Sequence, residues 1–249
     1  MVDPAYDVIG RDYAARRRPD ERVAAAIHRA LGAARTLVNV GAGSGSYEPT
    51  DRAVVAVEPS SVMIDQRPRG AAPAVRGVAE AMPFAADTFD VALAVLTLHH
   101  WSDVPSGLRE LQRVARRQVV LTWDPRVTIG FWLLTNYLPA IGEHEARLDP
   151  IDSALSLLDV ERVEPVLVPA DCTDGFLAAY WRRPEAYLDP RTRGAMSGIA
   201  VLDPRAVDEA MRRLAHDVHT GAWHERHADL LAMDEFDAGY RLVVSRSRR

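Results

Sequence analysis

Three closely spaced glycines and a later glutamate are the residues of this 249-residue chain that most clearly point to chemistry. An apolar run leads into Gly41, Gly43 and Gly45, and the next apolar run, residues 53–57, ends at Glu58. Glycine lets a backbone take a positive φ and approach a ligand without a Cβ in the way. A carboxylate at the tip of the second strand of a βαβ unit can accept hydrogen bonds from two ribose hydroxyls. The pattern therefore predicts a site for a nucleoside-containing cofactor.

The glycine loop does not match the motif that holds a pyrophosphate. Dinucleotide-binding loops follow G-x-G-x-x-G, whose third glycine permits close packing of the helix that receives the phosphates. Here the run is G-x-G-x-G, and Ser46 stands where the third glycine would be. The loop can bring the backbone close to a ligand but does not match the pyrophosphate fingerprint.

Three further motifs follow the glycine loop in a fixed order. They are Ala-Glu-Ala-Met-Pro-Phe at 79–84, Asp-Thr-Phe-Asp-Val-Ala-Leu-Ala at 87–94 and Leu-Thr-Leu-His-His-Trp at 96–101. With the glycine loop, they resemble in order and spacing the motifs of class I S-adenosylmethionine-dependent methyltransferases. The resemblance covers roughly residues 6–124 and is closest to the type 11, UbiE-like small-molecule branch.

The resemblance implies a fold, a cofactor and a set of cofactor-binding residues. The fold is α/β, with a Rossmann-like, doubly wound, seven-stranded and mainly parallel sheet whose last strand is antiparallel. The cofactor is S-adenosyl-L-methionine, which needs a ribose acceptor, an apolar slot for adenine and room for its methionine portion. The residues implied to bind it are Tyr6, Tyr13, Arg18, Asn39, Gly41, Ala42, Gly43, Gly45, Glu58, Pro59, Met63, Ala79, Glu80 and Leu96.

Individual positions follow or depart from the family pattern. By resemblance, Glu58 binds the ribose, Met63 forms a wall of the adenine slot, and residues 79–80 border the adenine edge. Asn39 stands where the family commonly has an acid, and it can still donate and accept hydrogen bonds. Val78 stands where many relatives have an aspartate that accepts a hydrogen bond from the adenine amino group. Recognition of that amino group therefore passes to backbone groups or to Glu80.

The N-terminal segment with Tyr6, Tyr13 and Arg18 resembles the segment that closes over the cofactor in related enzymes. Arg18 can pair with the methionine carboxylate, because a guanidinium suits bidentate recognition of a carboxylate. An ordinary solvated arginine cluster before a helix explains Arg18 equally well.

His99 and His100 are the candidate catalytic residues. They lie just beyond the fourth predicted strand, and strand ends line the ligand crevice of an open α/β sheet. Imidazole can exchange a proton near neutral pH, and His100 is the preferred general base. The alternative is that both histidines only shape the loop, with Trp101 packed beneath them.

Strands and helical stretches alternate along the chain, as βαβ units require. The apolar patterns predict strands at 36–40, 53–57, 74–78, 89–95, 118–123, 163–168 and 240–245. Residues 170–235 are too many for a structureless loop between the last two strands. We therefore predict a helical cap or substrate insertion at 170–235, on a methyltransferase domain of residues 1–169 plus 236–249.

Two helical regions carry a predicted apolar face. The helix after Trp101 is expected to bury Val104, Leu108, Leu111 and Val114, and the crossover within 125–160 to bury Ile129, Trp132, Leu133 and Leu138. The cap has large apolar side chains that we assign mainly to its own core, namely Phe176, Tyr180, Trp181, Tyr187, Met196 and Trp223.

Two polar features have competing interpretations. Asp124 either caps the turn at Pro125 or lines the substrate pocket, and the Asp-Pro signal favours the cap. A histidine cluster near the C-terminus can bind zinc or lie at a surface. Gly221 interrupts the cluster and no H-E-x-x-H pattern occurs, so the surface is favoured and no metal is expected; its members are His216, His219, His224 and His227.

Composition narrows the class of partner. The chain is 48% hydrophobic and 26% charged, which is typical of a soluble globular protein, and its net charge of −5 argues against a nucleic-acid partner. Its single cysteine, Cys172, excludes a disulfide framework. The apolar runs are too short to span a membrane, and the N-terminus lacks a signal pattern, so a cytoplasmic enzyme is expected.

These observations together predict methyl transfer from S-adenosylmethionine to a small-molecule acceptor by in-line displacement. An NAD(P)-dependent oxidoreductase shares the ribose acid but requires the pyrophosphate loop. A cofactor-binding protein without turnover is the third possibility, because a fold does not fix a function. The motifs specify neither the acceptor, nor the methylated atom, nor the oligomeric state.

Overall fold

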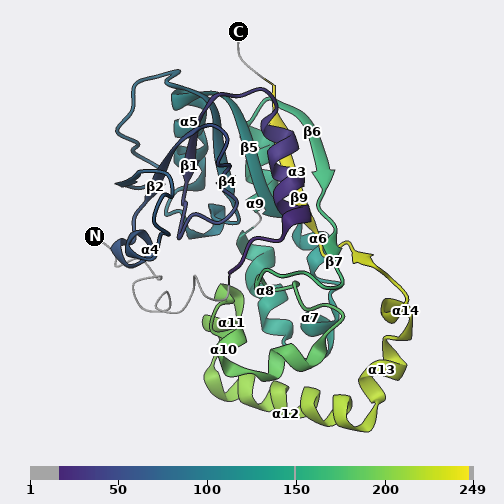
Figure 1. Ribbon diagram of the computed structural model, residues 1–249. Coiled ribbons are helices and arrows are strands. Elements are labelled where there is room, and N and C mark those ends of the chain that lie inside the picture. Colours follow the sequence, from purple (N-terminus) through teal and green to yellow (C-terminus); the bar gives the residue numbers. More distant parts are fainter. Residues whose placement is uncertain (1–16, 149, 247–249) are drawn as a thin grey trace.

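A seven-stranded sheet forms the centre of the protein in a computed structural model that describes residues 17–148 and 150–246 (Figure 1). The strand order is β3-β2-β1-β4-β5-β9-β6. All pairs from β3 to β5 are parallel, whereas β9 is antiparallel to both of its neighbours. The predicted α/β class and the antiparallel last strand are therefore confirmed.

The strands of this sheet are β1 Thr36–Val40, β2 Ala53–Glu58, β3 Ala74–Arg76, β4 Phe89–Val95, β5 Ala115–Trp123, β6 Val160–Pro165 and β9 Tyr240–Ser245. Strands β1, β4 and β9 have the predicted bounds, and the prediction for β6, 163–168, begins three residues late. The short strand β7, Val168–Pro169, instead pairs with β8, Glu235–Phe236, in a separate two-stranded ribbon. The central strands are buried on both faces, as parallel strands covered by helices must be.

Helices cover both faces of the sheet. Helix α3 (Glu21–Leu31) lies on one face, and α5 (Val104–Val114) with α9 (Pro150–Leu157) lies on the other. Leu37 faces the α3 side and Val38 the α5 side, so alternate residues of a strand join different cores. Helix α5 buries Leu108, Leu111 and Val114 as predicted. A short helix, α4 (Ser61–Asp65), follows β2.

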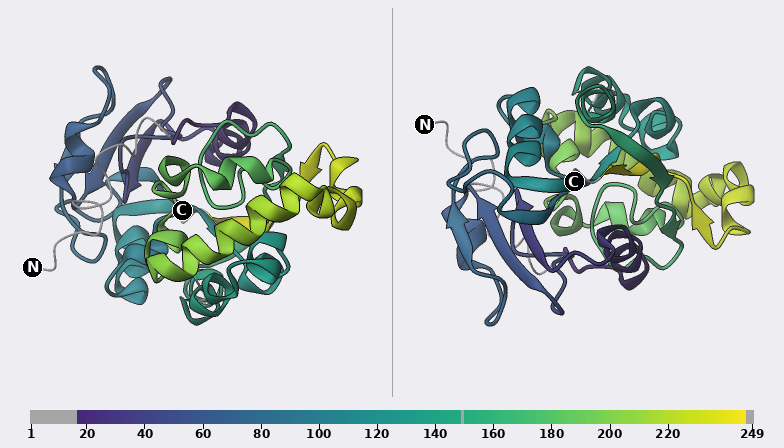
Figure 2. Two further views of the ribbon diagram at one scale, coloured as in Figure 1. Left: turned by 90° about the horizontal axis from the view of Figure 1, so that it is seen from below. Right: turned by 90° about the horizontal axis from the view of Figure 1, so that it is seen from above.

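A second group of helices lies beyond one end of the sheet, at the bottom of Figure 1. Seen from below, the long helix α12 lies across this end of the molecule (Figure 2). We call this group the helical layer; it comprises α6 Pro125–Thr128, α7 Trp132–Asn136, α8 Pro139–Leu148, η3 Pro184–Leu188, α10 Pro190–Arg193, α11 Ser197–Ala200, α12 Pro204–Thr220, α13 Ala222–Arg226 and α14 Ala228–Leu231. It therefore draws on residues 125–148 as well as on 170–235.

Aromatic side chains hold the helical layer together. The Trp132 ring contacts those of Tyr187 and Trp223 edge to face, with centroids 5.5 and 5.1 Å apart. The predicted cap residues Trp181, Tyr187 and Trp223 are fully buried, so their assignment to a core is confirmed. Ile129 is the exception among the predicted apolar faces: it is 52% exposed, because it lies at the end of the one-turn helix α6 beside Gly130.

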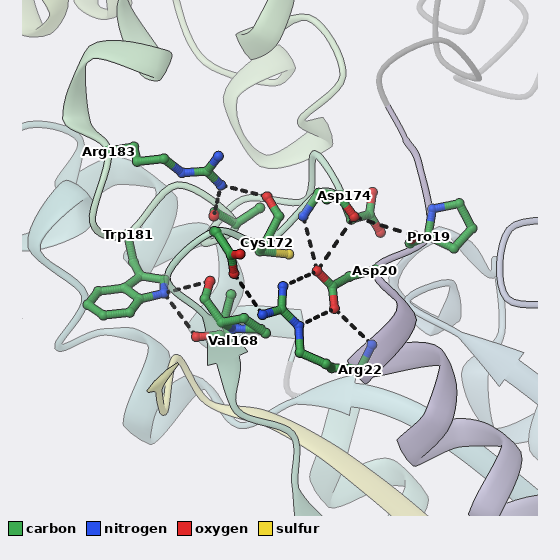
Figure 3. Close-up of polar contacts among 12 residues, drawn as sticks. Pro19, Asp20, Arg22, Val168, Cys172, Asp174, Trp181 and Arg183 are labelled. Atoms are coloured by element: carbon green, nitrogen blue, oxygen red, sulfur yellow. Dashed lines mark hydrogen bonds and ion pairs between the residues drawn. The ribbon is translucent and has the colours of Figure 1, made fainter. Parts of the chain in front are cut away.

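Short polar contacts fasten the segment after β7 to the start of α3 (Figure 3). Asp20 caps α3 and also accepts a hydrogen bond from the Thr173 backbone at 3.1 Å. Burial alone would raise the pKa of Asp20, but hydrogen bonds from Arg22 and Thr173 lower it to about 2. The carboxylate therefore stays ionised and keeps both segments joined at neutral pH.

A fully buried carboxylate, Asp174, joins three distant parts of the chain. Arg17 Nε donates to one oxygen at 2.6 Å and the Tyr47 hydroxyl to the other at 2.6 Å. The Gly175 backbone N–H donates as well, at 2.6 Å. Asp174 belongs to the segment that leads into the helical layer, and Tyr47 ends the glycine loop, so this carboxylate connects the layer to the predicted cofactor site.

We expect Asp174→Asn to lower the free energy of unfolding by about 3–5 kcal/mol, because it leaves the buried Arg17 without its counter-charge. Asp171→Asn is the matched control: its carboxylate is exposed and pairs with Arg22, so little change is expected. Denaturant titration of both variants measures the difference. Equal stabilities of the two variants would contradict this role of Asp174.

Candidate active site

The glycine loop is shaped by contacts with the ends of two strands. The backbone N–H groups of Gly41 and Ala42 both donate to the carbonyl of Val57 in β2, at 2.9 and 3.1 Å. Gly41 has φ +66°, and a Cβ built on it would overlap the Thr97 side chain that follows β4. Only glycine fits this position, because both the φ and the available space exclude a side chain.

Glu58 lies at the tip of β2 beside this loop, as the sequence predicts. Its side chain is buried, with one oxygen accepting from the Gly43 N–H at 2.8 Å and the other from the Ser60 N–H at 2.9 Å. Ser60 in turn caps α4 through the backbone of Met63. Two backbone donors thus orient the carboxylate at the loop and favour its ionised form.

An ion pair that the sequence reasoning missed braces the loop from behind. Arg67 and Glu48 are 2.6 Å apart, and both side chains are less than 8% exposed. Arg67 also donates to the Gly43 carbonyl at 3.3 Å, and the Asn39 amide donates to Glu48 at 3.0 Å. Asn39 therefore acts on the loop through Glu48, and no motif in the sequence pointed to this pair.

The residues predicted to surround adenine lie in three short segments. Met63 is buried, and its methyl group lies 3.3 Å from the position of a Cβ built on Gly43, so it packs against the glycine loop. Ala79, in the segment that follows β3, is buried, whereas Pro59 is half-buried. Glu80 accepts from the backbone N–H of Ser102 at 2.7 Å, which fixes its segment to the start of α5.

Leu96 follows β4 with an uncommon backbone. Its φ is +50°, in the left-handed region that a branched side chain rarely adopts. Its N–H donates to the Leu121 carbonyl in β5 at 2.8 Å, which holds it in place. Strain of this kind gathers at functional sites, and here it turns Leu96 into the wall of a cavity.

That cavity has a volume of about 170 Å³ and lies between the sheet and the helical layer. A water needs only about 10–15 Å³ by this kind of measure, so the cavity is large enough for an organic molecule. Its walls come from the segment after β4, the end of β5, the segment that leads into the helical layer, and the helical layer itself, which includes α8. The residues that line it include Leu96, His100, Trp123, Glu145, Phe176 and Met196. Phe176 and Met196 of the predicted cap thus line the cavity while they also belong to the buried core.

His99 and His100 both line the cavity, with ring centroids 3.6 Å apart. Burial, the neighbouring His100 and Arg17 hold the pKa of His99 well below its usual range. Burial followed by Arg17 lowers the pKa of His100 to about 4, although solvent in the cavity reaches its side chain. Both imidazoles are therefore neutral at physiological pH and can accept a hydrogen bond or a proton.

The structure also supports the alternative that His99 and His100 only shape the loop. Trp101 packs against α5 so closely that a Cβ on Gly107 would overlap its ring. His99 lies edge to face with Trp123 at 4.7 Å, and its Nε2 is 3.5 Å from the Ser197 hydroxyl. The loop is thus well packed on one side while both rings face the cavity on the other.

The remaining predicted site residues lie in different environments. Tyr6 and Tyr13 fall outside the described residues. Arg18 is exposed, whereas its neighbour Arg17 lines the cavity and bonds Asp174. Asp124 caps α6 through the Arg126 N–H, which confirms the favoured interpretation of that residue.

The residues present fit S-adenosylmethionine. Gly41, Gly43 and Gly45 all have positive φ and shape the loop, and Glu58 supplies an oriented carboxylate at the position expected for a ribose acceptor. Arg67, the cation nearest the loop in the hydrogen-bond network, is already paired with Glu48. The site therefore suits a cofactor without phosphate groups.

Neither a metal-binding cluster nor a membrane-spanning helix is found among the described residues. Across 17–148 and 150–246, no group of three or more His, Cys, Asp or Glu side chains is arranged to hold a metal ion. No helix in the same part of the chain combines the length and the apolar character needed to cross a membrane.

Comparison with known proteins now identifies the class. A family model described as a methyltransferase domain matches residues 38–122. A solved structure from Anabaena variabilis ATCC 29413, described as a methyltransferase from an antibiotic biosynthesis pathway, is 31% identical with a TM-score of 0.85. The alignment covers 92% of this chain and 98% of that one.

Two further matches are more distant. Geranyl diphosphate C-methyltransferase from Streptomyces coelicolor A3(2), solved with Mg²⁺, geranyl diphosphate and S-adenosyl-L-homocysteine, shares the fold at 16% identity and a TM-score of 0.51, over 90% of this chain and 78% of that one. The uncharacterized Escherichia coli (strain K12) protein YafE is 42% identical over 41 residues. That match covers 16% of this chain and 20% of YafE, so the chain spans only a small part of that protein's length.

The chain belongs to the class I S-adenosylmethionine-dependent methyltransferases, on the evidence of its domain match, its fold and its similarity to the Anabaena protein along nearly the whole chain. It is therefore an enzyme whose cofactor is S-adenosyl-L-methionine.

We expect Glu58→Gln to weaken binding of S-adenosylhomocysteine by about 10- to 100-fold. The amide places an NH₂ group against a backbone N–H that now donates to the carboxylate, and it removes the negative charge. Calorimetric titration measures the affinity. Glu161→Gln, an exposed change on β6, is the control, and equal affinities of the two variants would remove Glu58 from the site.

We expect the imidazole of His100 to remain neutral as the pH falls through 6.5 and to gain its proton only near pH 4, because its folded pKa is lowered to about 4. A ¹H–¹⁵N spectrum of ¹⁵N-histidine-labelled protein, recorded against pH, reports this transition, and His100→Gln identifies the signal. A midpoint at the value of a free histidine would contradict this environment.

Proposed function

We propose that this enzyme methylates a small molecule that binds in the cavity between the sheet and the helical layer. The observation that supports this most directly is that Leu96 and His100, which follow the central strand β4, form one wall of the cavity. In open α/β sheets, ligands bind at the carboxyl ends of the strands. The description of the Anabaena relative, from an antibiotic biosynthesis pathway, also favours a small-molecule acceptor.

In this proposal, the cofactor and the acceptor bind on opposite sides of Leu96. On one side, the glycine loop holds the methionine portion, Glu58 the ribose, and Met63 with Ala79 the adenine. On the other side, the cavity holds the acceptor. In this proposal residues 170–235 remain the substrate-binding insertion of the domain plan predicted from the sequence, with helices α6–α8 completing the walls.

S-adenosylmethionine supplies a methyl group on a positively charged sulfur; the methyl carbon bonds to a nucleophilic atom of the acceptor while the electron pair of the broken bond stays on sulfur. The protein contributes alignment, because a held acceptor reacts far faster than a free one. Its apolar walls, such as Phe176 and Met196, exclude water from the reacting atoms.

His100 is the proposed proton acceptor for an acceptor group that must lose a proton. It is neutral at physiological pH, since its pKa is lowered to about 4. Its low basicity suits a nucleophile whose own acidity rises as the new bond forms. His99 is proposed to orient the acceptor beside it, through the ring face that lines the cavity.

The alternatives predicted from the sequence have less support. An NAD(P)-dependent oxidoreductase needs a pyrophosphate site, and the G-x-G-x-G loop with its paired Arg67 does not provide one. A binding protein without turnover is disfavoured by the family. A cytoplasmic location and the absence of a nucleic-acid partner remain predictions from composition.

We expect S-adenosylhomocysteine to bind the protein and to raise its unfolding temperature, whereas NADH has no effect at the same concentration. Ligand at about 100 times its Kd stabilises the folded state by about 2.7 kcal/mol. Calorimetry and thermal unfolding with each ligand measure this. Stabilisation by NADH alone would reverse the assignment.

A further inference from the structure

One acidic side chain in the acceptor cavity is unused by the chemistry above. Glu145 lies on helix α8 and lines the cavity together with His144 and Leu148 of the same helix. Its Oε2 atom is buried and has no hydrogen-bond partner in the part of the chain that the structure describes. A buried polar atom without a partner costs free energy, so its presence in a ligand cavity indicates a partner supplied by the ligand.

Glu145 is close to the residues that follow β4. A Cβ built on Gly198 would lie 3.6 Å from its Oε1, and the adjacent Ser197 hydroxyl is 3.5 Å from His99 Nε2. The carboxyl and the imidazole therefore flank the start of α11 and face the same space. An acceptor molecule that reaches His100 can reach Glu145 as well.

Arg17, His99, His100 and Tyr240, which also line the cavity, do not neutralise Glu145. Arg17 donates to the fully buried Asp174 at 2.6 Å. His99 and His100 have lowered pKa values and are neutral. Tyr240 stays protonated, because burial and then Glu145 raise the pKa of its hydroxyl. Burial alone raises the pKa of Glu145 to about 7, with no cation acting on it.

We propose that the acceptor is an apolar molecule with a basic nitrogen, whose N–H group donates to Glu145. This proposal rests on the proposed function and adds the charge of the substrate. An ammonium group donates a hydrogen bond to the unpartnered oxygen and supplies the missing positive charge. An alcohol donates only the hydrogen bond, and a carboxylate does neither. Phe176, Leu177 and Met196 then cover the apolar remainder of the molecule.

The test compares three probes of one shape: 2-phenylethylamine, 2-phenylethanol and phenylacetate. Calorimetric titration uses protein saturated with S-adenosylhomocysteine at about pH 8, where the amine is protonated and the carboxyl ionised. We expect the amine to bind about tenfold or more tightly than the alcohol, and phenylacetate to bind most weakly.

Glu145→Gln keeps the shape of the side chain and removes its charge, so the amine should lose its advantage over the alcohol. Glu143→Gln, an exposed change on the same helix, should keep it. The affinity for S-adenosylhomocysteine is expected to be unchanged in both variants, which shows that the cofactor site is intact. At pH 8 Glu145→Gln should unfold at the same temperature or higher, because it removes a buried charge whose pKa is raised by burial, whereas Glu143→Gln should unfold as the original protein does.

Three results would overturn the inference: equal binding of the three probes, a preference for phenylacetate through Arg17, or no binding of the amine at about 10 mM to protein that holds S-adenosylhomocysteine. Failure to bind S-adenosylhomocysteine would instead contradict the proposed function, and the probe preference would then be measured on the protein alone.

Discussion

The fully buried carboxylate of Asp174 connects the segment before α3, the glycine loop and the helical layer. Asp174 is fully buried, and it is stable there only because Arg17 and the Tyr47 hydroxyl both donate to it. An isolated carboxylate in the interior would cost far more than the fold can offset. The segment before α3, the end of the glycine loop and the entry to the helical layer must therefore come together as a unit, and the cavity forms as a consequence.

The same carboxylate also fixes one end of the glycine loop. The loop is held by Val57 and Glu58, by the Arg67–Glu48 pair, and at its end by Tyr47 through Asp174. A loop fixed by three sets of contacts presents its backbone without rearrangement, which is what alignment of two reactants requires. Leu96, which follows β4 with a strained backbone, lines the cavity.

Local patterns in the sequence were sufficient for the sheet and for one side of the site. Strands β1 and β4 are buried on both faces and read as continuous apolar runs, so their bounds could be predicted. Strand β6 alternates half-buried and exposed residues at the sheet edge, and its start depends on an irregular register with β9 near Val160, which no local pattern reveals. Glu58 was predictable because parallel topology brings strand ends to one edge.

Residues whose partners lie far away in sequence were not predictable. Asp174 and Arg17 are 157 positions apart, and Arg67 acts on the loop through an ion pair with Glu48 that belongs to no motif. Glu145 reads as an ordinary surface helix residue in the sequence, and only the packing of α8 against α11 buries its oxygen.

The charges around the cavity are ordered in a way that suits a cationic methyl donor. The imidazoles nearest the strand ends are kept neutral by burial and by Arg17, so they add no positive charge where the proposed sulfonium lies. Arg17 itself is balanced by Asp174. The unbalanced group is the carboxyl of Glu145 on α8, which attracts a cation to the acceptor side of the cavity. A carboxylate beside a cationic acceptor offsets its charge, so the two positive reactants repel each other less as they approach.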